Sequence, residues 1–188
     1  MTQSAQEDLF SVLITDHREV ERAFRDLESG AMSDPQQRRD MADHVIAELV
    51  RHSVAEEMYL YPTARKKLPD GDQVADQEIA EHAEAERVMK ELDGLEATDP
   101  RFDELLRTLM REIRDHIRGE ENDLFPRLQA ACTQDELLEL GRKVTRAKQT
   151  APTRPHPSAP HKPPANKLLA PGAGLVDRLR DALSGRHT

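Results

Sequence analysis

Histidine and glutamate recur at matching positions in the two halves of this 188-residue chain. The halves are offset by 64 or 65 residues, and the repeat preserves four histidines and two glutamates. These six residues are His17, His52 and Glu56 in the first half and His82, His116 and Glu120 in the second. Imidazole and carboxylate donors without a thiolate suit iron, manganese or zinc. Because each carboxylate can bridge two cations, the set predicts a site for a pair of metal ions.

The spacing of the repeated residues places them on one face of a helix. Residues four apart project in nearly the same direction, so His52 with Glu56 and His116 with Glu120 form two ligand pairs. Apolar residues such as Ile113 share the face of His116, which indicates that the pair points inward. The positions of the four histidines relative to the predicted turns agree within about two helical turns. We therefore expect them to meet at one level.

A single buried histidine is more often a hydrogen-bonded core residue than a ligand, and one His-x-x-x-Glu pair is common on charged helices. Two copies, with two further histidines at matching depth, are much harder to explain as a solvated face. An apolar core does not readily hold so many ionisable groups without a metal. The simplest assignment has Glu56 and Glu120 bridging, with His17 and His52 on one ion and His82 and His116 on the other. Which histidines share an ion stays open.

Four long helices are predicted to position these residues. Their approximate ranges are 5–28, 35–62, 72–95 and 100–131. Asp34-Pro35 and Asp99-Pro100 are typical helix starts, since Asp accepts from free amides and Pro at the first position sacrifices no bond. Pro62 is expected to kink or end the second helix. Short loops between the helices favour an all-α, up-down-up-down four-helix bundle with a metal site in its core.

The remainder of the chain changes in character. A capping box at Thr133–Glu136 predicts a short helix over 134–148, which completes a bundle domain of residues 1–148. Residues 149–173 read as a proline-rich basic linker, and residues 174–188 as a short amphipathic helix (174–184) with a tail. The helix is expected to dock on the bundle or on a second subunit, because three turns alone are marginal in water.

Charge is divided unevenly along the chain. Residues 142–188 carry a net charge of +8, and subtracting this from the total of −9 leaves −17 for residues 1–141. We expect the basic tail to be solvated, although it could also lie on the acidic bundle. The acidic bundle argues against nucleic-acid binding. No stretch reaches membrane-spanning length, no signal peptide is recognised, and the single cysteine, Cys132, fits a reducing compartment. A cytoplasmic protein is expected.

The complete pattern resembles the hemerythrin-like proteins with HHE cation-binding domains, over roughly residues 8–130. The resemblance implies a non-haem centre of two iron ions, bridged by carboxylates, in a four-helix bundle. One departure is informative, because oxygen-carrying hemerythrins supply five histidines and this chain matches only four. The fifth would stand where this chain has Glu120. The poorer nitrogen set argues against reversible oxygen carriage and favours a site that admits peroxide, oxygen or nitric oxide.

Other donors near the six residues are interpreted more weakly. Tyr59 lies seven residues after His52, almost on the same face, and is a candidate iron ligand or a hydrogen-bonded core tyrosine. Its repeat partner is Asp123, so any difference between the two metals is expected to begin at this pair. Four repeated glutamates, Glu21, Glu57, Glu86 and Glu121, are interpreted as lying outside the ligand set. The histidines of the tail, His156, His161 and His187, show no spacing that relates them to the cluster.

Three functions are consistent with these residues. The leading hypothesis is a di-iron protein that decomposes hydrogen peroxide in a catalase-like way. A second is a protein that binds or senses oxygen, nitric oxide or iron status, with the C-terminal tail reporting to a protein partner or second subunit. A third is a bundle that only stores metal.

Overall fold

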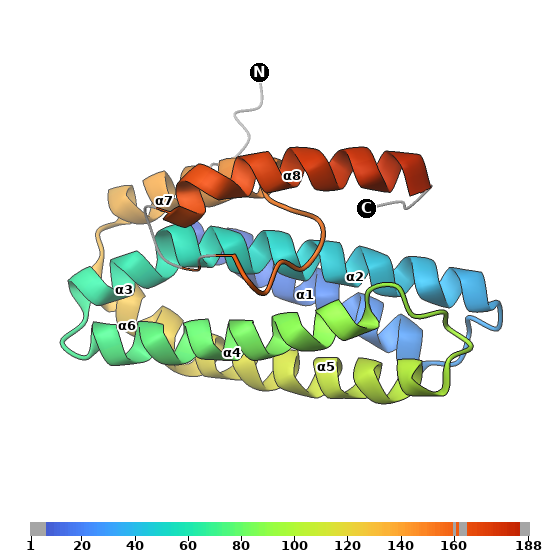
Figure 1. Cartoon of the computed structure of the whole chain (residues 1–188). Coiled ribbons are helices and arrows are strands. Elements are labelled where there is room, and N and C mark those ends of the chain that lie inside the picture. The colour runs from blue at the N-terminus through green and yellow to red at the C-terminus, as the bar shows by residue number, and fades with distance from the viewer. Residues whose placement is uncertain (1–6, 160, 162–164, 185–188) are drawn as a thin grey trace, which may run out of the picture.

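The bundle consists of four antiparallel helical rods. The computed structural model describes residues 7–159, 161 and 165–184, and this part of the chain contains helices and connections but no strand. The rods are α1 (Leu9–Glu28), α2 (Pro35–Ala55) continued by η1 (Glu56–Leu60) and α3 (Tyr61–Lys67), α4 (Gly71–Leu92), and α5 (Pro100–Gly119) continued by η2 (Glu120–Leu124) and α6 (Phe125–Ala131). They run up-down-up-down (Figure 1). The prediction of an all-α four-helix bundle is confirmed.

The helix starts follow the local chemistry of the sequence. Asp34 and Asp99 accept hydrogen bonds from backbone amides two residues ahead, each with a proline at the first helical position. The side chain of Thr133 accepts from the Glu136 amide while the Glu136 carboxylate accepts from the Thr133 amide, which completes the predicted capping box of α7 (Gln134–Thr150). The predicted start near Ala5 lies outside the described residues.

Pro62 does not end its helical rod, so the expectation that the helix could end there was wrong. The turns at Glu56–Leu60 and Glu120–Leu124 are π-helical, so the amide of Tyr61 donates to the carbonyl of Glu56 and that of Phe125 donates to Glu120. Each proline then stands at the start of a renewed α-helical segment, where its missing N–H is tolerated. The wider turn also changes which later residues lie above the two glutamates.

Two apolar cores lie on either side of the His/Glu layer. One is built around Phe24, Ile46, Leu92 and Phe102, and the other around Leu9, Leu60, Tyr61, Leu124 and Leu128. The repeated histidines and glutamates fall between them along every rod. The site is therefore closed off at both ends by packed side chains.

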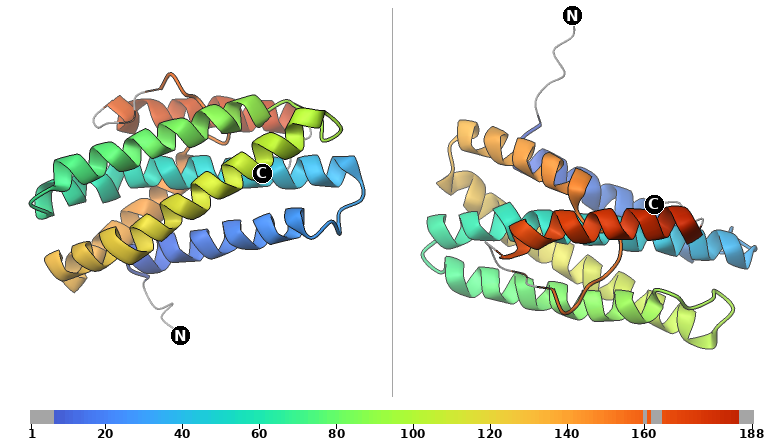
Figure 2. Two further views of the ribbon diagram at one scale, coloured as in Figure 1. Left: turned by 90° about the horizontal axis from the view of Figure 1, so that it is seen from below. Right: turned by 45° about the horizontal axis from the view of Figure 1, so that its top comes forward.

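The described residues of the C-terminal region, from α7 to residue 184, pack on the bundle, so the prediction of a solvated tail was wrong for this part of the chain. Helix α7 lies on α1 and α2, and α8 (Ala165–Ser184) runs beside α7 and η1 (Figure 2). Helix α8 begins inside the predicted linker and includes Pro171. The acidic side chains of α8 face inward: Asp177 and Asp181 are buried, while Leu175, Val176 and Leu179 are exposed. None of the described helices has the length and apolar content needed to cross a membrane.

Candidate metal centre

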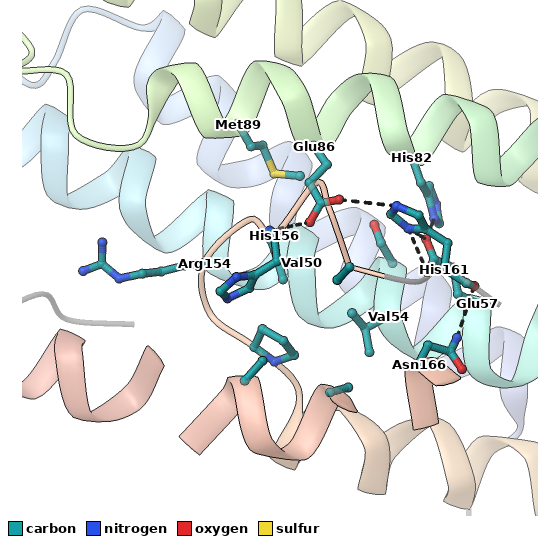
Figure 3. A pocket seen from close by; sticks show the side chains of 15 residues that line it. Val50, Val54, Glu57, His82, Glu86, Met89, Arg154, His156, His161 and Asn166 are labelled. Carbon is teal, nitrogen blue, oxygen red and sulfur yellow. Dashed lines mark hydrogen bonds and ion pairs between the residues drawn. The ribbon is translucent and has the colours of Figure 1, made fainter. Parts of the chain in front are cut away.

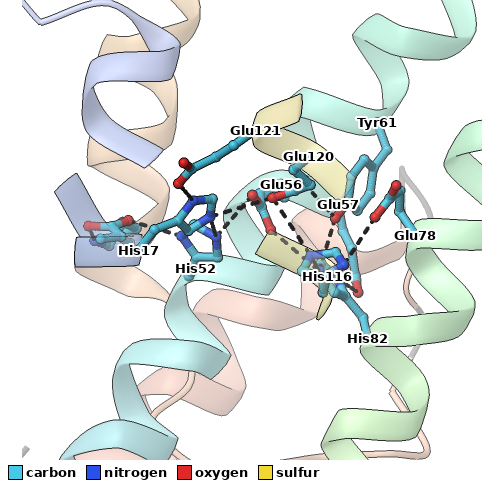
Figure 4. Close-up of polar contacts among 12 residues, drawn as sticks. His17, His52, Glu56, Glu57, Tyr61, Glu78, His82, His116, Glu120 and Glu121 are labelled. Atoms are coloured by element: carbon cyan, nitrogen blue, oxygen red, sulfur yellow. Dashed lines mark hydrogen bonds and ion pairs between the residues drawn. The ribbon is translucent and has the colours of Figure 1, made fainter. Parts of the chain in front are cut away.

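Four histidines from four rods meet in the middle of the bundle. His17 comes from α1, His52 from α2, His82 from α4 and His116 from α5, and none is more than 7% exposed. Their inner ring nitrogens form two close pairs: Nε2 of His17 is 3.1 Å from Nε2 of His52, and Nε2 of His82 is 3.1 Å from Nε2 of His116. The rods thus bring together all four histidines singled out in the sequence (Figure 4).

Glu56 and Glu120 lie between the two histidine pairs, and both are 0% exposed. One oxygen of Glu56 is 3.0 Å from His52 Nε2 and the other is 3.4 Å from His82 Nε2. Oε2 of Glu120 is 3.5 Å from His17 Nε2 and 3.7 Å from His116 Nε2. Each carboxylate therefore faces one histidine of each pair, which is the arrangement required of a bridge between two cations.

The donor set fits metal ions better than it fits a hydrogen-bonded core. Among the described residues no hydrogen bond of acceptable geometry reaches either oxygen of Glu56 or Oε2 of Glu120, and such burial is costly without a cation. Donor atoms within 4.8 Å of one another form three overlapping sets there: His17, His52, Glu56 and Glu120; Glu56, His82 and His116; and Glu78, His116 and Glu120. Imidazole and carboxylate donors without a thiolate suit first-row transition metals.

Each histidine also uses its outer nitrogen to donate a hydrogen bond to a carboxylate. The four Nδ1 pairs are His17 with Glu121 at 2.8 Å, His52 with Asp16 at 3.1 Å, His82 with Glu57 at 3.2 Å and His116 with Glu81 at 3.0 Å. A carboxylate at Nδ1 fixes the tautomer that leaves the lone pair on the inward Nε2. These carboxylates repeat with the same offset as the histidines, and that repetition was the sequence signal that could have assigned them.

The buried charges shift the proton affinities of the cluster. Burial lowers the pKa of His52, but the carboxylates of Glu56 and Asp16 outweigh it and raise the pKa to about 10. Burial also lowers the pKa of His116, but the charge of Glu120 outweighs burial, so the pKa lies well above its ordinary value. Burial raises the pKa of Glu56, whereas His52 and His82 bring it well below the ordinary value. Protons on His52 and His116 therefore offset part of the charge of the buried carboxylates in the metal-free chain.

The tyrosine at the cluster is Tyr61, at the place where the sequence predicted Tyr59. The Tyr61 hydroxyl lies 2.9 Å from His82 Nε2 and donates to Glu120 at 3.1 Å. The π-helical turn accounts for the difference, because a five-residue repeat stacks Tyr61 above Glu56. Tyr59 is partly buried at the edge of the apolar core that contains Leu60 and Leu124.

The two halves of the centre differ at Tyr61 and its repeat partner Phe125. The Phe125 ring stacks on His17, with ring centres 5.8 Å apart, and places a hydrocarbon face where the other half has a hydroxyl. The sequence predicted that the two metal environments differ first at Tyr59 and Asp123. In the structure this difference lies two residues later, at Tyr61 and Phe125. Burial and the neighbouring Glu120 raise the pKa of Tyr61 well above its ordinary value, so the hydroxyl keeps its proton in the metal-free chain.

Three cavities adjoin the cluster. One, of about 10 Å³, is lined by all four histidines together with Leu49 and Ile113, and has room for about one water-sized molecule. Another, of about 70 Å³, lies between α2, α4 and the C-terminal segment, with His82 and Glu57 at one end (Figure 3). A third, of about 340 Å³, opens between α4 and α5 and is lined by His82, His116 and Glu78. The space that all four histidines share is therefore small, while His82 and His116 also border a larger cavity.

The remaining glutamates are accounted for by other partners. Glu21 binds Arg114 through two hydrogen bonds, at 2.9 and 3.0 Å. Glu86 accepts from the backbone amide of His156 at 2.7 Å. Unlike the sequence prediction, which separated the tail histidines from the cluster, the structure brings His161 to Glu57 at 3.0 Å. His187 lies outside the described residues.

Comparisons with known proteins agree with this geometry. The family model of the hemerythrin HHE cation-binding domain matches residues 8–128. A hemerythrin-like protein of Schizosaccharomyces pombe is 30% identical over 172 residues, which cover 91% of this chain and 84% of that protein. A DNA nickase of Nostoc is 31% identical over 115 residues, covering 61% of this chain but only 31% of the nickase.

A solved structure shares the fold. The crystal structure of a hemerythrin HHE cation-binding domain-containing protein from Mycobacterium kansasii aligns with a TM-score of 0.65 at 20% identity, covering 76% of this chain and 86% of that one. The matched residues 8–128 include all six repeated histidines and glutamates. This chain belongs to the hemerythrin HHE cation-binding domain family, and the buried cluster marks it as a metal-binding protein.

Proposed function

We propose that the cluster binds two iron ions and that the loaded protein decomposes hydrogen peroxide. The observation that carries the proposal is a pair of buried glutamates that face imidazole nitrogens on both sides, with both oxygens of Glu56 and Oε2 of Glu120 lacking hydrogen bonds among the described residues. In this assignment His17 and His52 hold one ion, His82 and His116 hold the other, and Glu56 and Glu120 are shared. The repeat supports two ions rather than one, because each half contributes the same three donors.

Two iron ions, when bound, supply a two-electron couple that fits disproportionation of two peroxide molecules into two water molecules and one oxygen molecule. Residues of this chain would contribute to this reaction by orienting the metal ligands, by leaving space for the reactant and by supplying a proton. Carboxylates at Nδ1 hold each imidazole in the tautomer that binds metal. Two cavities offer a small reactant such as peroxide a place next to the cluster, a narrow one lined by all four histidines and a larger one lined by His82 and His116. The Tyr61 hydroxyl lies at the cluster and donates to Glu120, so it is placed to give its proton to an oxygen atom of a reactant beside Glu120.

Oxygen evolution from peroxide tests the proposal. The iron-loaded chain is expected to release oxygen rapidly, and His116→Ala is expected to lose both this activity and bound iron. His44→Ala is the matched control, because His44 is exposed on α2 and outside the cluster. An iron-loaded wild-type chain that leaves peroxide unchanged would contradict the peroxide function while leaving the metal site intact.

Ligand sensing is a second candidate, favoured by the contact between the tail and the cluster. His161 binds Glu57, which in turn binds His82, so a change at His82 is connected to the C-terminal segment. In this case oxygen or nitric oxide would alter the absorption spectrum of the iron-loaded chain and the amide exchange of residues 151–184, while peroxide would not be consumed. The exposed Leu175, Val176 and Leu179 of α8 support a protein partner or second subunit as the receiver.

A further inference from the structure

The carboxylates that orient His17 and His82 are held by different means. Glu121, the acceptor for His17 Nδ1, also receives both terminal nitrogens of Arg18, at 3.0 and 2.7 Å. The repeat offset that relates His17 to His82 relates Arg18 to Ala83. The carboxylate that orients His82 therefore lacks a bundle cation at the position where Arg18 anchors the carboxylate that orients His17.

The tail supplies a replacement for that cation. His161 Nδ1 donates to Glu57, at 3.0 Å to Oε1 and 3.2 Å to Oε2, and Oε1 is the same oxygen that accepts from His82. Glu57 beside His82 thus has the position that Glu121 has beside His17, with His161 in place of Arg18. His161 lies 78 residues beyond Ala83 in the chain, outside the family match at residues 8–128.

Several contacts fix the segment that brings His161 to the bundle. The side-chain amide of Asn166 donates to the His161 carbonyl at 3.2 Å, and the His156 amide donates to Glu86 at 2.7 Å (Figure 3). Apolar side chains of Val50, Val54 and Met89 line the cavity next to these contacts. A hydrogen bond to an ionised group in such surroundings is stronger than one in open solvent.

We infer that His161 is a positioning residue for the His82 half of the metal centre. It anchors Glu57, and Glu57 keeps the Nδ1 proton on His82, so that Nε2 presents its lone pair to the metal. Arg18 and Glu121 perform the same task for His17. The inference rests on the proposed metal site, and it makes one half of that site depend on the C-terminal segment.

Binding of Co²⁺ to the metal-free full chain tests this inference, with affinities measured by calorimetry and visible absorption. His161→Ala is expected to weaken one of the two sites by about tenfold or more, as loss of a partner behind a metal ligand commonly does. Arg18→Ala is expected to weaken the other site. In the double variant His161→Ala/Ala83→Arg the introduced arginine restores the weakened site, because it recreates the arrangement of the first half.

His156→Ala is the matched control. Its ring contacts Asp177 rather than the cluster, and its backbone amide remains available to Glu86. Imidazole NMR of the Zn²⁺-loaded chain adds a readout of position: the Nδ1 proton of His82 should exchange faster in His161→Ala, while that of His17 is unchanged. Circular dichroism verifies that each variant is folded.

Three results would overturn the inference: unchanged affinities in His161→Ala, equal weakening of both sites, or a weakened site that Ala83→Arg does not restore. A wild-type chain that binds fewer than two ions would instead refute the proposed metal site on which the inference rests. The two failures are therefore distinguishable in one set of titrations.

Discussion

Both oxygens of Glu56 and Oε2 of Glu120 are buried without a hydrogen bond among the described residues. Each unpaired buried polar group costs about 1–3 kcal/mol, and a charged group costs more. In the metal-free chain, protonated histidines offset part of this cost. Metal ions would offset it more fully, because a divalent cation contacts the carboxylate oxygens directly. The site is therefore stable only when positive charge of some kind is present.

Metal binding should release protons. The pKa of His52 is raised to about 10 and that of His116 lies well above the ordinary value, so both hold a proton at neutral pH that a metal must displace. The apparent metal affinity is expected to rise as pH increases from about 6.5 toward 10. Calorimetry in buffers of different ionisation enthalpy should show release of at least one proton at pH 7.5. An enthalpy that does not depend on the buffer would contradict this prediction.

Substituting the two tyrosines should separate their roles. Tyr61→Phe removes the hydroxyl next to His82, so that a phenyl ring lies beside His82 as the Phe125 ring lies beside His17. The visible spectrum of the iron-loaded chain is expected to change in Tyr61→Phe and to stay the same in Tyr59→Phe. If only Tyr59→Phe altered the spectrum, the placement of Tyr61 at the iron site would be incorrect.

Site residues that repeat on regular helices could be predicted from the sequence, whereas a site residue beyond a π-helical turn and one in the C-terminal tail could not. His52 and Glu56 are four apart in an α-helix, so their common face could be predicted. Tyr61 could not, because the π-helical turn after Ala55 changes the angular step from one residue to the next. His161 was missed for another reason: it has no repeat partner, and its contact with Glu57 depends on how the tail folds back.

At the scale of helices, close backbone approach fixes the position of α7. A Cβ added at Gly141 would lie 2.5 Å from the Glu7 carbonyl oxygen, so only glycine permits α7 to cross the start of α1 at this distance. By contrast, a Cβ at Gly119 of α5 would meet nothing within 4 Å. The two glycines are thus a matched pair for testing the packing of α7.

Alanine at these two positions should have opposite effects on stability. Gly141→Ala is expected to lower the free energy of unfolding by about 1–3 kcal/mol, because backbone must move to make room. Gly119→Ala should leave it unchanged or raise it by up to about 1 kcal/mol, owing to the higher helix propensity of alanine. Urea denaturation followed by circular dichroism measures both. Equal stability of the two variants would show that α7 does not cross α1 as described.

At the scale of the whole molecule, α8 is attached to the bundle by its polar face. Asp181 is 3% exposed and accepts from Thr153 and Arg154, while Leu179 on the opposite face is 58% exposed. The apolar pattern of residues 174–184 predicted a helix that docks on the bundle or on a second subunit, without saying which face docks. Buried hydrogen bonds to the segment that follows α7 decide the orientation, and a helix pattern by itself contains no information about them.

Amide exchange should reveal which face docks. Asp181→Ala removes one acceptor of the Thr153 hydroxyl and of the Arg154 side chain, so faster exchange is expected over residues 151–184 but not in α1 to α6. Leu179→Ser changes the exposed face and should leave exchange in the monomeric chain as in the wild type. Faster exchange in Leu179→Ser alone would mean that the apolar face is the docked one.

The iron content of the full chain, purified after expression with ample iron, tests the central claim most directly. Elemental analysis against protein concentration is expected to give about two iron ions per chain, falling below one in Glu56→Gln, where the bridging charge is lost but the shape is kept. The control His44→Ala should retain the wild-type content. A wild-type chain that contains fewer than one transition-metal ion, although correctly folded by circular dichroism, would contradict the dinuclear metal centre.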